Sequence, residues 1–320
     1  MPLWKQTGGP DLAKRLAPLR VVVIIGGIGA ILYWARGHGA ALSPKGSILQ
    51  LALALLANQV AIGLLALRFH ACMRLFGIPL SAWQSARICL QGIFYMFFIP
   101  VSIGNEVSRY IKIRQVAPET PAAPLLAGLL VDRVAGLIGF LVIAGALALH
   151  QPRFARMPAM LDGHMTAFAA VTGIAIAALC SLLFIPRIRH VLRSTIAATR
   201  SHADWAAANA ALSVLVPIAF TVAIHTSCRW VGFDLPWDAL AFAIAVSSIG
   251  QIIPISIGGL GATEVGTSLI LIALGTPEPS AMVAGSICYL ARLMVAVEGG
   301  VWELASRDGR RAAAAAMRDS

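Results

Sequence analysis

The segments PVSIGNE (residues 100–106) and PISIGGLGATE (residues 254–264) decide the fold of this chain. In each segment a proline precedes a glycine by four residues inside a long apolar run, and a glutamate follows. Proline removes a backbone hydrogen-bond donor and glycine permits a turn, so each segment predicts a break between two helices. The breaks correspond at an offset of 154 residues, since 254 − 100 and 258 − 104 give the same number.

The similarity extends upstream of both breaks. A histidine, an arginine and a glycine recur in the same order at an offset of 155 residues: His70, Arg74 and Gly77, then His225, Arg229 and Gly232. Broken apolar segments at matching places in two halves are typical of membrane transporters, and the breaks indicate the binding site. Chance is the alternative interpretation, because proline and glycine are common in membrane helices. The constant register of the matched positions favours a repeat.

The composition excludes a water-soluble domain. The chain is 58% hydrophobic and 12% charged, with a mean hydropathy of +0.81. Continuous apolar runs, without the alternation of barrel strands, predict a helical membrane protein. The net charge of +11 is explained by basic cytoplasmic loops, and we expect no nucleic-acid partner. No nucleophile–base pair, nucleotide-binding loop or metal-ligand pattern is visible, so we expect neither a cofactor nor a metal site.

We predict an all-α polytopic membrane protein with six full transmembrane helices and two re-entrant helical hairpins. The hairpins are expected at Ala86–Arg114 and Leu240–Gly275, because each side of the break is short for a full crossing. Irregular backbone at this depth must be buried in protein or face a water-filled cavity. The full spans are expected at Leu19–Ala35, Ile48–Leu67, Leu125–Leu149, Met165–Ile185, Ala206–Thr226 and Ser280–Leu304.

The loop charges predict the orientation. If the hairpins do not cross, most lysines and arginines, Arg68 and Lys112 among them, fall on the side of the amino terminus, which places both termini in the cytoplasm. An odd number of crossings then separates the repeats, approximately residues 48–150 and 206–304, so the repeats are inverted. Residues 1–304 form one transmembrane domain, and residues 305–320 form a short cytoplasmic tail. If the hairpins cross fully, the repeats are parallel.

The second half-helix of each broken region is the first candidate for a binding site. Its first N–H groups lack intrahelical partners and carry positive potential, which suits an anionic group such as a lipid phosphate. The turn residues that offer hydroxyls or open backbone are Pro100, Ser102, Gly104, Asn105, Pro254, Ser256, Gly258, Gly259 and Gly261.

Charged residues inside the predicted membrane segments are the second candidate. A charge at bilayer depth costs about 2.5–3.5 kcal/mol, so it needs a partner or a wet cavity. One hypothesis is a polar track that escorts a head group. The other is a set of internal ion pairs, such as Glu106 with Arg109 or Glu264 with Arg292, and the two hypotheses are compatible. The candidates are Glu106, Arg109, Asp132, Arg133, Glu264 and Arg292, and Glu298 lies in the same last span.

The two break segments, the pair Asp132-Arg133 followed by Gly136, and Arg292 resemble the lysylphosphatidylglycerol synthase transmembrane family. This family is the flippase-like part of the multiple peptide resistance factor. The resemblance covers nearly the whole chain, and the second break segment is its most specific part. Two departures are Asn105, where the family motif runs from glycine directly to glutamate, and Asp132, where glutamate is more usual.

The resemblance implies a lipid flippase or lipid transporter of the bacterial cytoplasmic (inner) membrane that moves a lipid with a polar or anionic head group. The family's soluble aminoacyltransferase domain has no counterpart in this sequence, so we expect lipid movement and no enzymatic activity. The expected partners are a phospholipid or other membrane lipid, the bilayer and a coupling ion; the oligomeric state stays open. The alternatives are an ion-coupled small-solute transporter, a membrane-embedded transferase and a membrane partner of a lipid-modifying enzyme.

Overall fold

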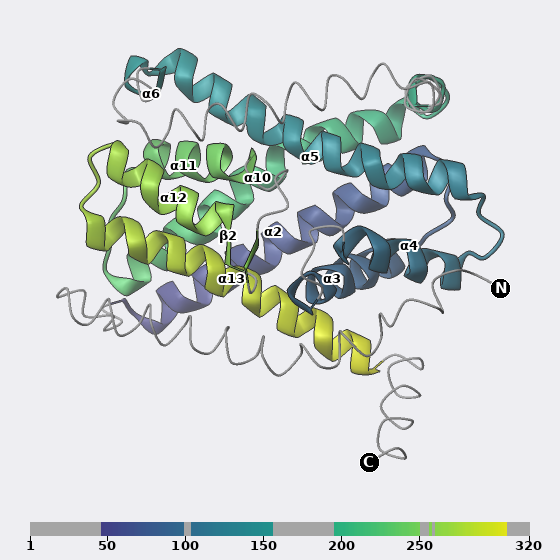
Figure 1. The fold of residues 1–320 in the computed structure, drawn as a ribbon, viewed down its shortest axis with the longest axis horizontal. Coiled ribbons are helices and arrows are strands. Elements are labelled where there is room, and N and C mark those ends of the chain that lie inside the picture. Colours follow the sequence, from purple (N-terminus) through teal and green to yellow (C-terminus); the bar gives the residue numbers. More distant parts are fainter. Residues whose placement is uncertain (1–45, 99–103, 156–194, 250–255, 258–259, 306–320) are drawn as a thin grey trace.

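The computed structural model describes residues 46–98, 104–155, 195–249, 256–257 and 260–305 (Figure 1). The predicted spans at Leu19–Ala35 and Met165–Ile185, and the tail after residue 305, lie outside these ranges.

The described part of the chain contains four helices that are long and apolar enough to cross a bilayer. These helices are α2 (Ile48–Leu75), α5 (Ala122–His150), α10 (Ala203–Val231) and α13 (Glu278–Ala305). They confirm four of the predicted spans, and each helix is longer than its apolar run. The chain is therefore a multi-pass membrane protein.

Each broken region forms two short helices, as predicted. The first region gives α3 (Ala82–Phe98) and α4 (Gly104–Val116), and the second gives α11 (Trp237–Ile249) and α12 (Ala262–Ala273). The second break also contains the antiparallel strands β1 (Ser256–Ile257) and β2 (Leu260–Gly261), which the sequence did not predict. The described part of the chain also contains the single turn α6 (Pro152–Ala155) after α5 and helical residues at 195–201 before α10.

The repeated glycines of the sequence end the first helix of each half. Gly77 and Gly232 have φ angles of 70° and 98°, the left-handed region that favours glycine. The N–H of each glycine donates to the carbonyl of the arginine three residues earlier, Arg74 or Arg229, at 3.0 Å in both halves. This arrangement satisfies carbonyls that the end of a helix leaves without partners. The repeat of sequence is therefore a repeat of structure at these helix ends.

Burial repeats at the same offset. Each buried residue of α10 has a buried counterpart in α2, 155 residues earlier, although several side chains differ in chemistry. The pairs are Ala54 and Asn209, Asn58 and Ser213, Ala61 and Val216, Ile62 and Pro217, Ala66 and Thr221, Arg68 and Ala223, Phe69 and Ile224, and Met73 and Cys228. Helices α5 and α13 share buried positions at an offset of 156, such as Leu125 with Ala281 and Gly128 with Ala284.

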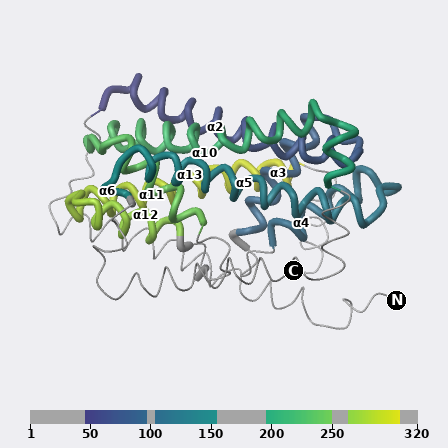
Figure 2. Tube along the Cα trace, turned by 90° about the horizontal axis from the view of Figure 1, so that it is seen from above, coloured from purple at the N-terminus to yellow at the C-terminus, as the bar shows by residue number. Residues whose placement is uncertain are grey.

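The helices pack in an exchanged pattern. Helix α2 lies against α10, the short helix α3 of the first half packs on α13 of the second, and α11 of the second half packs on α5 of the first. The pair α3 and α4 lies at one end of the molecule, and the pair α11 and α12 lies at the other end (Figures 1 and 2). The exchange is reciprocal: the short helix of each half contacts the last long helix of the other half.

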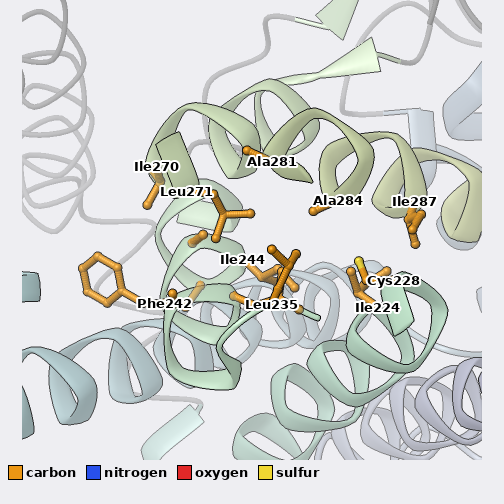
Figure 3. Packing of buried hydrophobic residues seen from close by; sticks show 14 of the residues in the cluster. Ile224, Cys228, Leu235, Phe242, Ile244, Ile270, Leu271, Ala281, Ala284 and Ile287 are labelled. Carbon is orange, nitrogen blue, oxygen red and sulfur yellow. The ribbon is translucent and has the colours of Figure 1, made fainter. Parts of the chain in front are cut away.

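Small side chains allow the close packing of the second half. Figure 3 shows Ile244 of α11, Leu271 of α12 and Ala284 of α13 converging on one buried cluster with residues of α10.

At the crossing of α5 and α10, a Cβ atom added to Gly139 would lie 1.8 Å from the carbonyl oxygen of Ser213. Only glycine fits at this position.

We expect Gly139→Ala to destabilise the protein by about 1–3 kcal/mol, because the added methyl group overpacks a crossing of two backbones. Gly145→Ala on the same helix is the matched control, since nothing lies within 4 Å of its Cβ position. Thermal unfolding in detergent micelles measures both variants. Equal midpoints would contradict the packing described at Gly139.

We expect the two hairpins to open toward opposite sides of the membrane. In a chain without native cysteines, Ser81→Cys before α3 and Glu119→Cys after α4 should react from one side, and Asp234→Cys before α11 from the other. A membrane-impermeant thiol reagent applied to oriented vesicles measures the side. Labelling of residues 81 and 119 from different sides would show that α3 and α4 cross fully.

Candidate functional site

The same ion pair occurs after each break. Glu106 and Glu264 are both the third residue of the second short helix, α4 or α12. Each carboxylate pairs with an arginine of the following long helix, Glu106 with Arg133 and Glu264 with Arg292, where the Oε1–Nη2 distance is 3.1 Å. An acid in the first turn also interacts favourably with the helix dipole. These pairs fix the start of each second short helix against the long helix that follows it.

The two pairs differ in their access to the surroundings. The Glu264 side chain is 4% exposed and that of Arg292 is 22% exposed. The Arg133 side chain is 40% exposed and that of Glu106 is 24% exposed. A bound group can therefore reach the pair of Glu106 and Arg133 more easily than the pair of Glu264 and Arg292.

A buried cluster of one carboxylate and two guanidinium groups joins α2, α4 and α5. Asp132 Oδ1 lies 3.2 Å from Arg68 Nη2, and Asp132 Oδ2 lies 3.2 Å from Arg109 Nη1. The three side chains are 8%, 3% and 5% exposed in the order Arg68, Asp132, Arg109. With both arginines charged and the aspartate ionised, the cluster carries a net charge of +1. A buried positive charge of this kind calls for an anionic partner.

The cluster keeps unused hydrogen-bonding capacity. The Nε groups of Arg68 and Arg109 and the Oδ1 atom of Asn105 are buried and have no hydrogen-bond partner among the described residues. Arg109 Nη2 lies 3.0 Å from the Sγ atom of Cys89, and its guanidinium carbon lies 4.7 Å from the ring centroid of Phe69. Spare guanidinium donors suit the oxygen atoms of a phosphate or carboxylate.

Two glycines make room for the arginines. A Cβ atom on Gly136 would lie 2.4 Å from Arg68 Nη1, and one on Gly92 would lie 2.3 Å from Asn105 Oδ1 and 3.0 Å from Arg109 Nε. Gly136 is part of the motif after Asp132 on which the family resemblance rests. Glycine is needed at position 136 because the Arg68 side chain reaches from α2 and lies close to the backbone of α5 there.

The second half does not repeat this cluster. The position of Arg68 corresponds to Ala223 at the offset of 155, and the position of Arg109 corresponds to Thr267 at the offset of 158 that relates Glu106 to Glu264. Thr267 Oγ1 lies 2.8 Å from Ser247 Oγ, so a neutral hydrogen bond joins the two short helices there. The halves share a scaffold and differ in charge.

The predicted ion pairs are confirmed in one half and corrected in the other. Glu264 pairs with Arg292 as expected. The expected pair of Glu106 with Arg109 is wrong, because Glu106 pairs with Arg133 and Arg109 pairs with Asp132. Glu106 and Arg109 lie on the same short helix α4, and each of them pairs instead with a residue of α5.

The turn residues of the prediction lie mostly outside the described part of the chain. These are Pro100, Ser102, Pro254, Gly258 and Gly259. Gly104 is buried at the first position of α4, while Ser256 and Gly261 are partners in the β1–β2 pair. The open backbone expected at Gly261 is thus a strand ladder at that residue.

Sequence reasoning missed Arg68 and Lys112 as interior residues, because both were placed among the loop cations. Arg68 lies inside α2, and Lys112 Nζ lies 2.7 Å from Glu303 Oε1 with both side chains 13% exposed. The signal for Arg68 was helical spacing: Ala61, Arg68 and Leu75 recur every seven residues on the buried face of α2.

A further set of bonds ties α13 to the first half. Gln59 of α2 donates to Glu298, Lys112 of α4 pairs with Glu303, and Gln91 of α3 donates to the carbonyl of Trp302 at 3.5 Å. Among the described residues no three His, Cys, Asp or Glu side chains gather as a set of metal ligands.

Comparison with known proteins identifies the family. The family model described as the lysylphosphatidylglycerol synthase TM region matches residues 17–297. The chain therefore belongs to this family, as the motifs predicted. No curated protein and no solved structure matches the chain.

We expect Asp132→Asn to lower the free energy of unfolding by about 3–5 kcal/mol, because it leaves two buried guanidinium groups without a carboxylate. Glu106→Gln is the matched control and should cost about 1 kcal/mol or less, since water or lipid head groups screen its half-exposed partner. Chemical denaturation in detergent micelles measures both values. A smaller loss for Asp132→Asn than for Glu106→Gln would show that the buried cluster is not ionised as described.

Proposed function

We propose that this protein is a transporter, and not an enzyme, that moves a lipid with an anionic head group between the leaflets of the bacterial cytoplasmic membrane. Membership of the family supports a role in lipid handling. The observation that carries the proposal is the buried cluster of Arg68, Asp132 and Arg109, which has a net positive charge and unused donors.

The charge of the cluster matches a phosphodiester. One negative phosphate would neutralise the net charge of +1, and its oxygens would accept from the guanidinium groups that Asp132 leaves unsaturated. Arg fits such a group better than Lys because its planar fork gives two parallel hydrogen bonds. The acyl chains need no protein site, since they stay in the surrounding lipid.

The pair of Glu106 and Arg133 is the proposed entrance. Its partly exposed guanidinium would meet the phosphate first, and α4 links it to the interior because Glu106 and Arg109 are one turn apart. Opening of the ion pair would exchange one anionic partner of Arg133 for another, so the charge of Arg133 stays compensated during entry.

The two ends of the molecule would open alternately. We place the termini in the cytoplasm and the two hairpins on opposite sides, in the inverted arrangement predicted from the loop charges. The location of α3 and α4 at one end and of α11 and α12 at the other supports this arrangement (Figure 1). Rocking of the halves around the cluster would expose it to each side in turn.

We expect proteoliposomes of the wild-type protein to move labelled phosphatidylglycerol between leaflets faster than empty liposomes do. Arg133→Gln removes one charge-assisted contact of about 1.5–3 kcal/mol, so the rate at subsaturating lipid should fall roughly ten- to a hundredfold. Arg229→Gln is the matched control, because this exposed arginine at the end of α10 pairs with Asp234 and takes part in neither of the ion pairs that follow the breaks.

Reduction of a fluorescent head group by an impermeant reagent follows the lipid. Equal rates in wild-type and empty liposomes across anionic, zwitterionic and cationic head groups would refute lipid movement. Uptake of a water-soluble anion by the same vesicles, without any lipid movement, would favour the small-solute transporter instead.

A further inference from the structure

We propose that Glu298 and Gln59 form a proton-binding site that couples transport to a proton gradient. The inference rests on the proposed transport function and extends it to the energy source. The two residues meet where α13 contacts α2.

Two exposed acids in the first turns of long helices, Asp204 and Glu278, have no ion pair among the described residues. The other acids within the described helices have cationic partners, with one exception. Asp132, Glu106, Glu264 and Glu303 each pair with an arginine or lysine. Glu298 has a hydrogen bond from the neutral Nε2 group of Gln59 and no ion pair with any residue that the structure describes.

Glu298 lies inside α13, beside apolar surface. It lies seven residues before the end of α13 at Ala305, which is about 10 Å along the helix axis. Its neighbours Val297 and Val301 are exposed apolar residues, as expected of a surface that lipid covers. A carboxylate inside a membrane helix needs a partner, and among the described residues the partner of Glu298 is the neutral amide of Gln59.

Glutamine accepts both protonation states of the carboxyl group. Its amide can donate to a carboxylate, and it can also accept from a protonated carboxyl group while donating to the other oxygen. A lysine or arginine partner would hold the carboxylate in the charged form. The pair of Glu298 and Gln59 is thus a carboxyl site that can gain and lose a proton without losing its hydrogen bond.

No other titratable side chain of the described residues forms a hydrogen bond or an ion pair with Glu298. Within the described ranges no hydrogen bond or ion pair joins it to the titratable and charged groups on the helices around α13. These groups are Arg87, Cys89 and Tyr95 on α3, Glu106, Arg109, Tyr110, Lys112 and Arg114 on α4, Glu264 on α12, Asp204, His225, Cys228 and Arg229 on α10, and Arg68, His70, Cys72 and Arg74 on α2.

The site joins the two halves of the molecule. Gln59 belongs to the first helix of the first half, and Glu298 belongs to the last helix of the second half. When the Glu298 carboxylate takes a proton from water on one side, it loses the negative charge that strengthens its hydrogen bond with the Gln59 amide. Release of that proton to water on the other side restores the charge. Proton binding would therefore bias the relative position of the halves that alternating access requires.

The test uses proteoliposomes of phosphatidylcholine that contain labelled phosphatidylglycerol, with and without a pH difference across the membrane. If one proton accompanies one lipid, each pH unit should shift the final leaflet ratio of the wild-type protein by up to about tenfold. A protonophore should abolish the shift. Glu298→Gln should still let the lipid equilibrate but should give the same ratio at every pH difference.

Glu278→Gln is the matched control, because this exposed acid lies in the first turn of the same helix and should keep the full response. Infrared difference spectroscopy supplies a readout that needs no transport. The carbonyl band of a protonated carboxyl group should titrate with pH in the wild-type protein and disappear in Glu298→Gln.

The outcomes separate the two proposals. A response to the pH difference that persists in Glu298→Gln, or lipid movement by the wild-type protein that ignores the pH difference, would overturn the coupling site. A wild-type protein that moves no lipid but shows the titrating carboxyl band would refute lipid transport and keep the proton site. Loss of both would refute the two proposals together.

Discussion

The cost of a charge in hydrocarbon shapes the interior of this protein. Asp132 lies between two guanidinium groups from different helices, and each acid that follows a break meets an arginine on the next long helix. These contacts hold helices in place because parting them would leave an uncompensated ion in an apolar medium. The same contacts give an interior that is rich in cations, in which a further anionic group is energetically acceptable.

The two halves use one scaffold for different chemistry. The buried positions of α10 coincide with those of α2, and the glycine caps at Gly77 and Gly232 make the same hydrogen bonds. Against this shared background, Arg109 over Gly92 in the first half corresponds to the hydrogen-bonded Thr267 and Ser247 in the second. Large and small side chains thus compensate for each other at equivalent contacts, so a charged site and a neutral site fit the same backbone arrangement.

Much of the scaffold was predictable from the sequence, because it rests on local signals. Apolar length predicted the long helices, and proline with glycine predicted the breaks. The residues of the buried cluster were harder to predict. Arg68 sits at the end of an apolar run, where helical spacing alone places it on the buried face of α2, and its carboxylate partner Asp132 is distant in sequence. The partner of Glu106 and the strands β1 and β2 likewise depend on how helices meet in space.

The exchange of short helices between the halves bears on how such a chain could be assembled. Helix α3 packs on α13 and α11 packs on α5, so each half provides part of the surface that the short helix of the other half covers. A polypeptide with one half alone would leave that face bare until a second copy supplied it.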